Sequence, residues 1–194
     1  MKNWDGVYTK NSPAAAIFEQ FYINFAENLA KDEMGKKLYG EYTSSDILIR
    51  NLVKNVWNHP ESPWCDDVRT ENKKEGFSDI VQNSFIEAVD TLSEQMGEEP
   101  ERWQWGNIHQ LTLSHPIGGE VPVVDMIFNM NRGPFKLGGG PHTVCAYDYS
   151  FSSSFSFNTG PSQRHVYSLA NWDSSRTVIP TGTSGIPSSR YYFL

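Results

Sequence analysis

Apolar residues in the first part of the chain recur at helical spacing. A first helix is predicted to begin at Ser12-Pro13, because serine is a favoured N-cap and proline fits the first helical turn. Its apolar positions fall four residues apart, at Ile17, Phe21, Phe25 and Leu29. This spacing predicts one broad apolar face that packs against the rest of the protein.

Two more helices are predicted before residue 100. The second begins near Ser45-Asp46 and ends at Asn58-His59-Pro60, with its apolar stripe at Leu48, Leu52 and Val56. The third begins near Ser78 and ends at Gly97, since glycine favours helix termination. Its stripe is expected at Val81, Phe85, Val89, Leu92 and Met96. Residues 58–77 are polar and rich in turn formers, so we expect an exposed connection there.

The second part of the chain changes to the alternation that is typical of strands. Residues 108–113 alternate apolar with polar side chains, as a half-buried strand does. Further strands are predicted over residues 143–149, 150–158, 163–169 and 176–179. Residues 138–141 are glycine-rich and are expected to form a turn, and residues 184–189 a loop.

These patterns together predict an α+β fold in which helices are followed by antiparallel strands. A chain of 194 residues is long enough for one domain. We therefore expect a single domain or fragment over residues 1–194, mainly helical over residues 1–102 and made mainly of strands and loops over residues 103–194.

Charge differs between the two parts and excludes some partners. The net charge is −7, and most acidic side chains lie before residue 105. Without a basic surface, binding to nucleic acid or to an anionic membrane is not expected. No apolar run is long enough for a transmembrane helix, and the N-terminal residues do not resemble a signal peptide. The low-charge second part must either bury much of itself or pack against a partner.

No short motif defines a metal or nucleotide site. The five histidines include no i, i+4 pair, and Cys65 and Cys145 are too far apart for a CxxC pair, although they could form one disulfide or none. His142, beside the glycine-rich turn, is the best candidate for a supporting role at a site. A structural, hydrogen-bonded role is expected for His109. Arg132 and Arg164 are expected to pin loop carbonyl groups or a carboxylate.

A series of longer segments, in fixed order over residues 103–188, resembles the penicillin acylase family. The first is a W-x-W-G-x-x-H segment, followed by His115-Pro116 and then by a G-P-F segment before two glycines. Later segments are T-V, G-P-S-x-R and S-G-x-P-x-S. The residues that carry the resemblance are Trp105, Gly106, His109, Arg132, Gly133, Phe135, Thr143, Gly160, Pro161, Ser162, Arg164, Ser184 and Gly185. They match the C-terminal part of a family β chain.

The resemblance implies the αββα sandwich of the N-terminal nucleophile (Ntn) hydrolases, made by a precursor that cleaves itself into two chains. In this family the new N-terminal serine of the β chain attacks an amide carbonyl. Its own α-amine, with a pKa of roughly 7.7–8.0, acts as general base. An asparagine and backbone N–H groups form the oxyanion hole. Calcium accompanies some intact enzymes of the family, and many members are exported, which leaves the location of this chain unknown.

The sequence departs from the family pattern at the nucleophile. Residue 1 is Met, and the chain has no Gly-Ser or Gly-Cys pair that could serve as a processing junction. The nucleophile, the oxyanion-hole asparagine and the calcium ligands are expected upstream of the matched segments. We therefore expect no catalytic residue, metal or cofactor in this chain, which should be inert alone. His142 stands where the family often has an acidic or amide residue, so its supporting role is in doubt.

Three functions remain open at this point. The first is a C-terminal portion of a penicillin acylase-like amidohydrolase, whose partner is the remainder of the precursor or a second chain. Its substrate would be an amide with an apolar acyl group, such as an acylated β-lactam or an acyl-homoserine lactone. The second is a free-standing, non-catalytic binding module with an acylase-like fold, and the third is a hydrolase that uses Ser162 or Ser184 with a histidine. Exposed strand edges also predict self-association.

Overall fold

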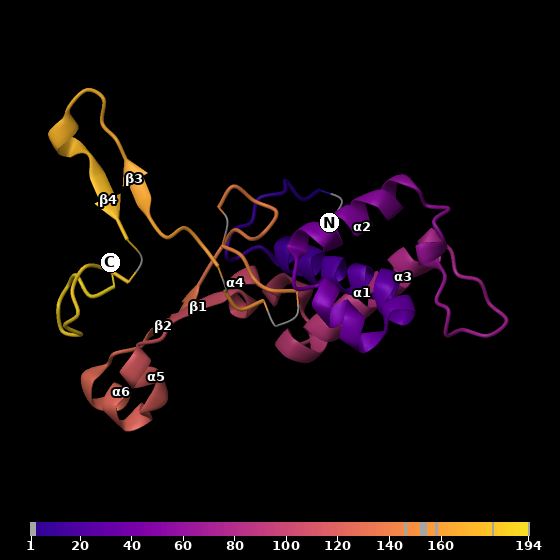
Figure 1. Cartoon of the computed structure of the whole chain (residues 1–194), viewed down its shortest axis with the longest axis horizontal. Coiled ribbons are helices and arrows are strands. Elements are labelled where there is room, and N and C mark those ends of the chain that lie inside the picture. Colours follow the sequence, from indigo (N-terminus) through magenta and orange to yellow (C-terminus); the bar gives the residue numbers. More distant parts are fainter. Residues whose placement is uncertain (1–2, 146, 152–154, 158, 180, 194) are drawn as a thin grey trace.

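The computed structural model describes residues 3–145, 147–151, 155–157, 159–179 and 181–193. It consists of a helical body, formed by α1, α2 and α3, and an extended arm (Figure 1). The β1–β2 ribbon leads away from the body to two short helices, α5 and α6. The β3–β4 ribbon and the C-terminal segment lie at the same end of the molecule as this arm.

The first helix, α1, spans Pro13–Tyr42 and begins where the sequence predicted. The Ser12 hydroxyl accepts a hydrogen bond from the Ala15 N–H at 3.2 Å, which caps the helix. Gly35 adopts φ 67° and ψ 166° and interrupts the helical geometry near the C-terminal end. Phe25 and Leu29 are buried and form the centre of the core between the three long helices.

The helices α2 (Asp46–Asn58) and α3 (Phe77–Met96) confirm the predicted positions, but their buried faces are displaced. In α2, Ile49 is buried with Leu52 and Val56, whereas Leu48 is 42% exposed. In α3, Leu92 of the predicted stripe is buried, but the other buried positions are Ile80, Ser84 and Ala88, and Phe85 of the stripe is 41% exposed. Small side chains at residues 84 and 88 allow α3 to approach α1 closely, so packing rather than maximal apolarity selects this face.

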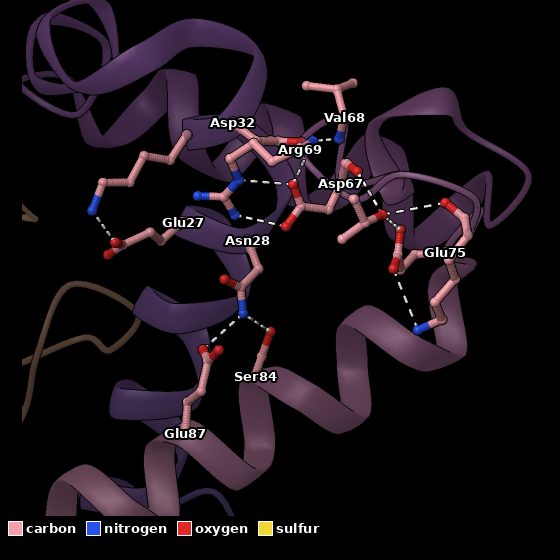
Figure 2. A network of polar contacts seen from close by, with 12 residues as sticks. Glu27, Asn28, Asp32, Asp67, Val68, Arg69, Glu75, Ser84 and Glu87 are labelled. Carbon is pink, nitrogen blue, oxygen red and sulfur yellow. Dashed lines mark hydrogen bonds and ion pairs between the residues drawn. The ribbon is translucent and has the colours of Figure 1, made fainter.

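Polar contacts fasten the helices and the connection between them (Figure 2). Asn28 of α1 donates to the Ser84 hydroxyl at 3.1 Å and to a Glu87 carboxylate oxygen at 2.8 Å, both on α3. The Asp32 carboxylate accepts from the Val68 N–H at 2.9 Å.

The expectation of an exposed connection over residues 58–77 is therefore only partly right. The connection contains the short 3-10 helix η1 (Pro63–Cys65), and Cys65 is 2% exposed within the core. Glu75 is also buried, and its carboxylate accepts a hydrogen bond from the Thr70 hydroxyl at 2.9 Å.

The first strand starts later than predicted, and it is followed by two helices that the sequence pattern did not indicate. After η2 (Pro100–Arg102), residues Trp105–Ile108 form the short helix α4, so β1 is confined to Gln110–Leu113. It pairs antiparallel with β2 (Arg132–Lys136). Between the strands lie α5 (Pro116–Glu120) and α6 (Pro122–Phe128), each opened by a proline. Helices this short cover less than two turns, so their apolar residues show no helical period.

The later strands are shorter than predicted. Strands β3 (Arg164–Val166) and β4 (Arg176–Val178) pair antiparallel, with η3 (Trp172–Ser174) between them. The strands predicted over residues 143–149 and 150–158 are wrong for the described residues, which show only the isolated bridge between Asp148 and Thr159. Residues 146, 152–154 and 158 of those predictions lie outside the described residues. The aromatic residues Tyr149 and Phe155 pack into the core beside α1 instead of lining a sheet.

The described residues thus form a mixed α+β structure with two small antiparallel sheets, each of two strands. Residues 184–189 form the predicted loop. Most of the core lies in the helical body, and a second buried cluster joins α1 to the start of the arm through Ala15, Ala16, Trp105, Tyr149 and Phe155.

Candidate functional site

The first family-like segment binds the N-terminal residues to the glycine-rich turn. Trp105 is fully buried, and its indole N–H donates to the Gly139 carbonyl at 2.8 Å. The Gly139 N–H donates in turn to the Tyr8 carbonyl at 2.9 Å, and the Gly106 N–H donates to the Lys10 carbonyl at 2.7 Å. We call these five residues the motif clasp. It joins three segments that are far apart in the sequence.

Two glycines of the motif clasp are required by its geometry. A Cβ at Gly106 would lie 3.0 Å from the Lys10 carbonyl oxygen and 2.9 Å from the Lys136 Cβ. Gly139 adopts φ 75°, and a Cβ there would lie 2.2 Å from the Cys145 carbonyl oxygen. The contact at Gly139 is closer than a real Cβ tolerates, and a Cβ at Gly106 would force its neighbours to shift, so the backbone approaches of the motif clasp depend on the absence of side chains at both positions.

His109 extends the motif clasp into the core. Its ring stacks on Trp105 with centroids 4.6 Å apart, and its Nδ1 donates to the Phe155 carbonyl at 2.7 Å. Burial lowers the pKa of His109 below its usual value, which favours the neutral imidazole. Its Nε2 has no hydrogen-bond partner in the part of the chain that the structure describes.

Thr143 stabilises the turn that precedes it. Its hydroxyl accepts from the Gly140 N–H at 3.1 Å and donates to the Cys145 carbonyl at 2.9 Å. The thiol of Cys145 is free and exposed, and Cys65 is free and buried, so the two cysteines form no disulfide. The glycine-rich stretch is therefore a structural turn braced by a threonine.

A buried polar cluster lies beside the motif clasp. Glu19 of α1 is fully buried, and one of its oxygens accepts a hydrogen bond from the Tyr149 hydroxyl at 2.5 Å. The same oxygen lies 3.8 Å from Nε2 of His142, the predicted supporting candidate. The edge of the His142 ring meets Tyr22 with centroids 4.7 Å apart. The Tyr8 hydroxyl is buried beside the Glu19 carboxylate and interacts with it.

Desolvation sets the charge of this cluster. Burial raises the pKa of Glu19 to about 7, and the hydrogen bond from Tyr149 opposes this rise only in part. Burial lowers the pKa of His142 to about 4, with a further lowering by the nearby Arg50 guanidinium. Near neutral pH the imidazole is therefore uncharged and Glu19 is close to half-protonated. The Glu19 carboxyl can therefore gain or lose a proton near neutral pH.

Arg132 joins the arm to the C-terminal segment. Its guanidinium donates to the Pro187 carbonyl at 2.9 Å and to the Asn131 carbonyl at 3.0 Å. It also lies over the rings of Tyr192 and Phe193, at 4.9 and 5.2 Å from their centroids. Arg132 thus binds loop carbonyl groups, as predicted. Gly133 follows it in β2.

Replacing Arg132 with methionine should loosen the C-terminal segment. A charged donor to backbone carbonyls contributes about 1.5–3 kcal/mol, so amide exchange should rise roughly tenfold or more at residues 183–192. Hydrogen exchange followed by mass spectrometry measures this change. Arg190→Met is the matched control, because Arg190 contacts only the ring of its neighbour Tyr191 among the described aromatic residues. Equal exchange in the two variants would contradict the assigned role.

Two cavities collect the remaining family-like residues. An apolar cavity of about 520 Å³ is lined by Phe135, Gly160, Pro161, Ser162 and Arg164, together with leucines of β1 and aromatic residues. The Arg164 guanidinium lies over the Tyr147 ring at 5.1 Å and is the one charged group among the lining residues. A second cavity of about 370 Å³ is lined by His115, Arg132, Ser184 and Gly185, among others. The family-like segments therefore meet in space at the motif clasp and at these cavities.

Of the two serines considered as nucleophiles, Ser184 holds a turn and Ser162 lies in the wall of the apolar cavity. The Ser184 hydroxyl accepts from the Ile186 N–H at 3.1 Å, and His115, in the wall of the same cavity, uses Nδ1 to accept from the Ile117 N–H at 3.1 Å. No hydrogen bond joins Ser162 or Ser184 to a histidine in the described ranges. These contacts give no support to a serine hydrolase site.

Neither a metal-binding cluster nor a membrane-spanning helix is found among the described residues. Within the described ranges, no three His, Cys, Asp or Glu side chains gather in a group that could hold a metal ion. None of the described helices combines the length and apolar character that a membrane span needs.

The sequence reasoning missed Glu19 and Tyr149, which form the centre of the buried cluster. One signal was present, because Glu19 falls on the same helical face as Ala15, Ala16 and Tyr22, all buried. A carboxylate inside an apolar face indicates a buried partner. The partner, Tyr149, lies 130 positions away and could not be inferred from local spacing.

Comparison with known proteins identifies the same family as the family-like segments do. The sequence profile of the penicillin amidase family matches residues 1–193. The chain is 27% identical over 198 residues to acyl-homoserine lactone acylase QuiP of Pseudomonas syringae pv. tomato, covering 97% of this chain and 23% of that protein. The QuiP protein of Pseudomonas aeruginosa is 25% identical over 203 residues, covering 97% of this chain and 24% of that protein.

A further relative is matched over a shorter stretch. The penicillin acylase 2 proenzyme of Pseudomonas sp. strain SE83 is 33% identical over 88 residues, which is 45% of this chain and 11% of that protein. The chain spans under a quarter of the length of these curated relatives. Since the family profile matches nearly every residue, this chain belongs to the penicillin amidase family.

Proposed function

We propose that this chain is a C-terminal portion of a penicillin acylase-like amidohydrolase. The observation that carries the proposal is the family match along residues 1–193. The share of the relatives that the chain covers, 23% for one QuiP protein, supports a larger protein to which these residues contribute. In that protein they would supply helices and strands of an αββα sandwich and part of the wall of the substrate cleft.

The proposed reaction is hydrolysis of an amide with an apolar acyl group. Water is consumed, the bond between the carbonyl carbon and nitrogen breaks, and a carboxylic acid and an amine are released. The names of the relatives, acyl-homoserine lactone acylase and penicillin acylase, support an acylated substrate. The nucleophile would be the N-terminal residue of the rest of the protein, with its α-amine as general base.

The role of the described residues in this proposal is structural. Trp105, Gly106 and Gly139 fix the N-terminal residues to the glycine-rich turn, and Arg132 fixes the C-terminal segment. His142 faces a buried carboxyl and an aromatic ring, an environment that suits a packed, neutral imidazole. These contacts support a scaffold for a cleft rather than a catalytic centre within this chain.

The test compares the protein isolated from its source with the 194-residue chain alone. We expect the source protein to contain, besides these residues, a polypeptide that begins with Ser, Thr or Cys. It should hydrolyse an N-acyl-homoserine lactone or an acylated β-lactam, whereas the chain alone should release no detectable amine at equal concentration. Intact mass, N-terminal sequencing and an amine-release assay measure these outcomes.

Two results would overturn the proposal. Amide hydrolysis by the purified chain alone would place a catalytic centre within it. A source protein consisting of a single 22.0 kDa species without hydrolase activity would favour a free-standing binding module.

A further inference from the structure

The α5–α6 hairpin exposes apolar side chains at the end of the arm. We call the following residues the apolar tip: Ile117, Val121, Val123, Met126, Ile127 and Phe128. Met126 is 77% exposed and Ile127 is 64% exposed. The tip lies beyond the β1–β2 ribbon, far from the helical body (Figure 1). Contiguous exposed apolar side chains of this kind mark interaction sites on folded proteins.

The apolar tip is held in a defined shape by polar contacts beneath it. Asn131 donates from its side chain to the Gly118 carbonyl at 3.2 Å and accepts from the His115 N–H at 2.7 Å. The Asp125 carboxylate accepts from the Asn131 N–H at 2.6 Å. These bonds connect both helices to the ribbon, so the apolar side chains are displayed on a built structure. A preformed surface loses little conformational entropy when it binds.

The solvent-accessible surface of the chain is larger than expected for its mass, which also indicates a binding partner. The chain exposes 12467 Å², whereas a compact protein of 22.0 kDa exposes about 9,300 Å². The excess of roughly 3,100 Å² is large enough for one side of a permanent protein–protein interface. The apolar cavity of about 520 Å³ and exposed side chains of β4 and the C-terminal segment belong to the same end of the molecule.

Charge limits what can cover the apolar tip. Residues 103–131 contain Glu120 and Asp125 and neither lysine nor arginine. An acidic tip is repelled by anionic lipid, so a membrane surface is disfavoured as its partner. It is complementary to a protein groove with an apolar floor and basic side chains at the rim. More than three quarters of the length of the QuiP relatives lies outside the region that matches this chain, which supplies a candidate for that groove.

We propose that the apolar tip is the surface by which this chain seats on the remaining polypeptide of its amidase, in an apolar groove with a basic rim. This inference rests on the proposed function, because it takes the rest of the amidase as its partner. The tip thereby holds the arm in place, and the arm carries the cavity wall formed by Phe135 of β2.

The experiment measures hydrogen exchange in the amidase isolated from its source and in the 194-residue chain alone. We expect amides of residues 116–128 to exchange at least tenfold more slowly in the amidase. Met126→Lys introduced into the amidase should abolish this protection and weaken assembly at least tenfold. Val68→Lys is the matched control, because Val68 is a 61% exposed apolar residue of the connection between α2 and α3, and this change should leave both the protection and the assembly unaltered.

The outcomes separate this inference from the proposed function. Both substitutions replace exposed side chains, so the variant chains should unfold at the same denaturant concentration as the original, which excludes misfolding as the cause. An active amidase with an unprotected tip, or equal effects of the two variants, would overturn the inference and leave the proposed function intact. An assembly made only of copies of the 22.0 kDa chain would overturn both and identify a second copy as the occupant.

Discussion

Replacing Trp105 with alanine is expected to lower the free energy of unfolding by about 3–5 kcal/mol. The indole is fully buried, stacks on His109 and donates to the Gly139 carbonyl, so its removal leaves both a cavity and an unpaired carbonyl. Chemical denaturation followed by circular dichroism measures the change. Removing the indole should also free the N-terminal residues, because Trp105 positions Gly139 and the Gly139 N–H donates to the Tyr8 carbonyl.

Trp172→Ala is the matched control for this experiment. Trp172 is 71% exposed in η3, and substitutions of exposed residues alter stability by about 0.5 kcal/mol or less. Similar losses in the two variants would show that Trp105 does not link the arm to the body.

Replacing Glu19 with glutamine is expected to make the protein less sensitive to pH. The pKa of Glu19 is raised from 4.5 to about 7, so the folded state holds the proton more tightly than the unfolded state does. The stability contributed by the protonated carboxyl is complete below pH 4.5 and is lost as the pH rises through 7. Glutamine keeps an acceptor for the Tyr149 hydroxyl and removes the buried charge. The variant should therefore gain about 2–3 kcal/mol relative to the original between pH 5 and pH 8.

The measurement is the difference in unfolding free energy between variant and original at the two pH values. His142 adds its own pH dependence, because its pKa is lowered to about 4 and its stabilising contribution is lost as the pH falls from 6.5 through 4. Glu101→Gln, at an exposed position of η2, provides the control and should show no such change. A difference that is independent of pH would show that Glu19 is not buried as a carboxyl group.

The long helices could be predicted because their signals are local and repeated. Ser12 caps α1 and Gly97 ends α3, and both contacts involve residues close in sequence. The buried face was harder to predict, as Leu48 and Ile49 show. Both are good apolar candidates, and only packing against another helix decides that Ile49 is the buried one.

Strand prediction failed where aromatic residues alternate with small polar ones. The Phe and Ser pattern before residue 158 has the period of a strand, yet Phe155 contacts Trp105 and its carbonyl accepts from His109. A period of two indicates side chains on alternating faces, but it does not supply a neighbouring strand with free hydrogen-bonding groups. Long-range contacts decided the conformation at Phe155.

Some residues of the candidate site could be predicted from the sequence and others could not. The family-like segments indicated Trp105, Gly106, His109 and Arg132, and the structure shows each of them joining distant parts of the chain. Glu19 and Tyr149 belong to no such segment and were missed. Their pairing depends on a contact across 130 positions, which no local spacing records.

The motif clasp has a consequence for the order in which the chain acquires its structure. Tyr8 and Lys10 are synthesised about 100–130 residues before their hydrogen-bond partners, Gly139 and Gly106. The three long helices rely on contacts within residues 13–96 and can form while synthesis continues. The N-terminal residues must wait until about 130 further residues have been made, which is a slow, non-local closure. During that interval residues 8–10 lack these hydrogen bonds, which leaves them open to proteases and chaperones.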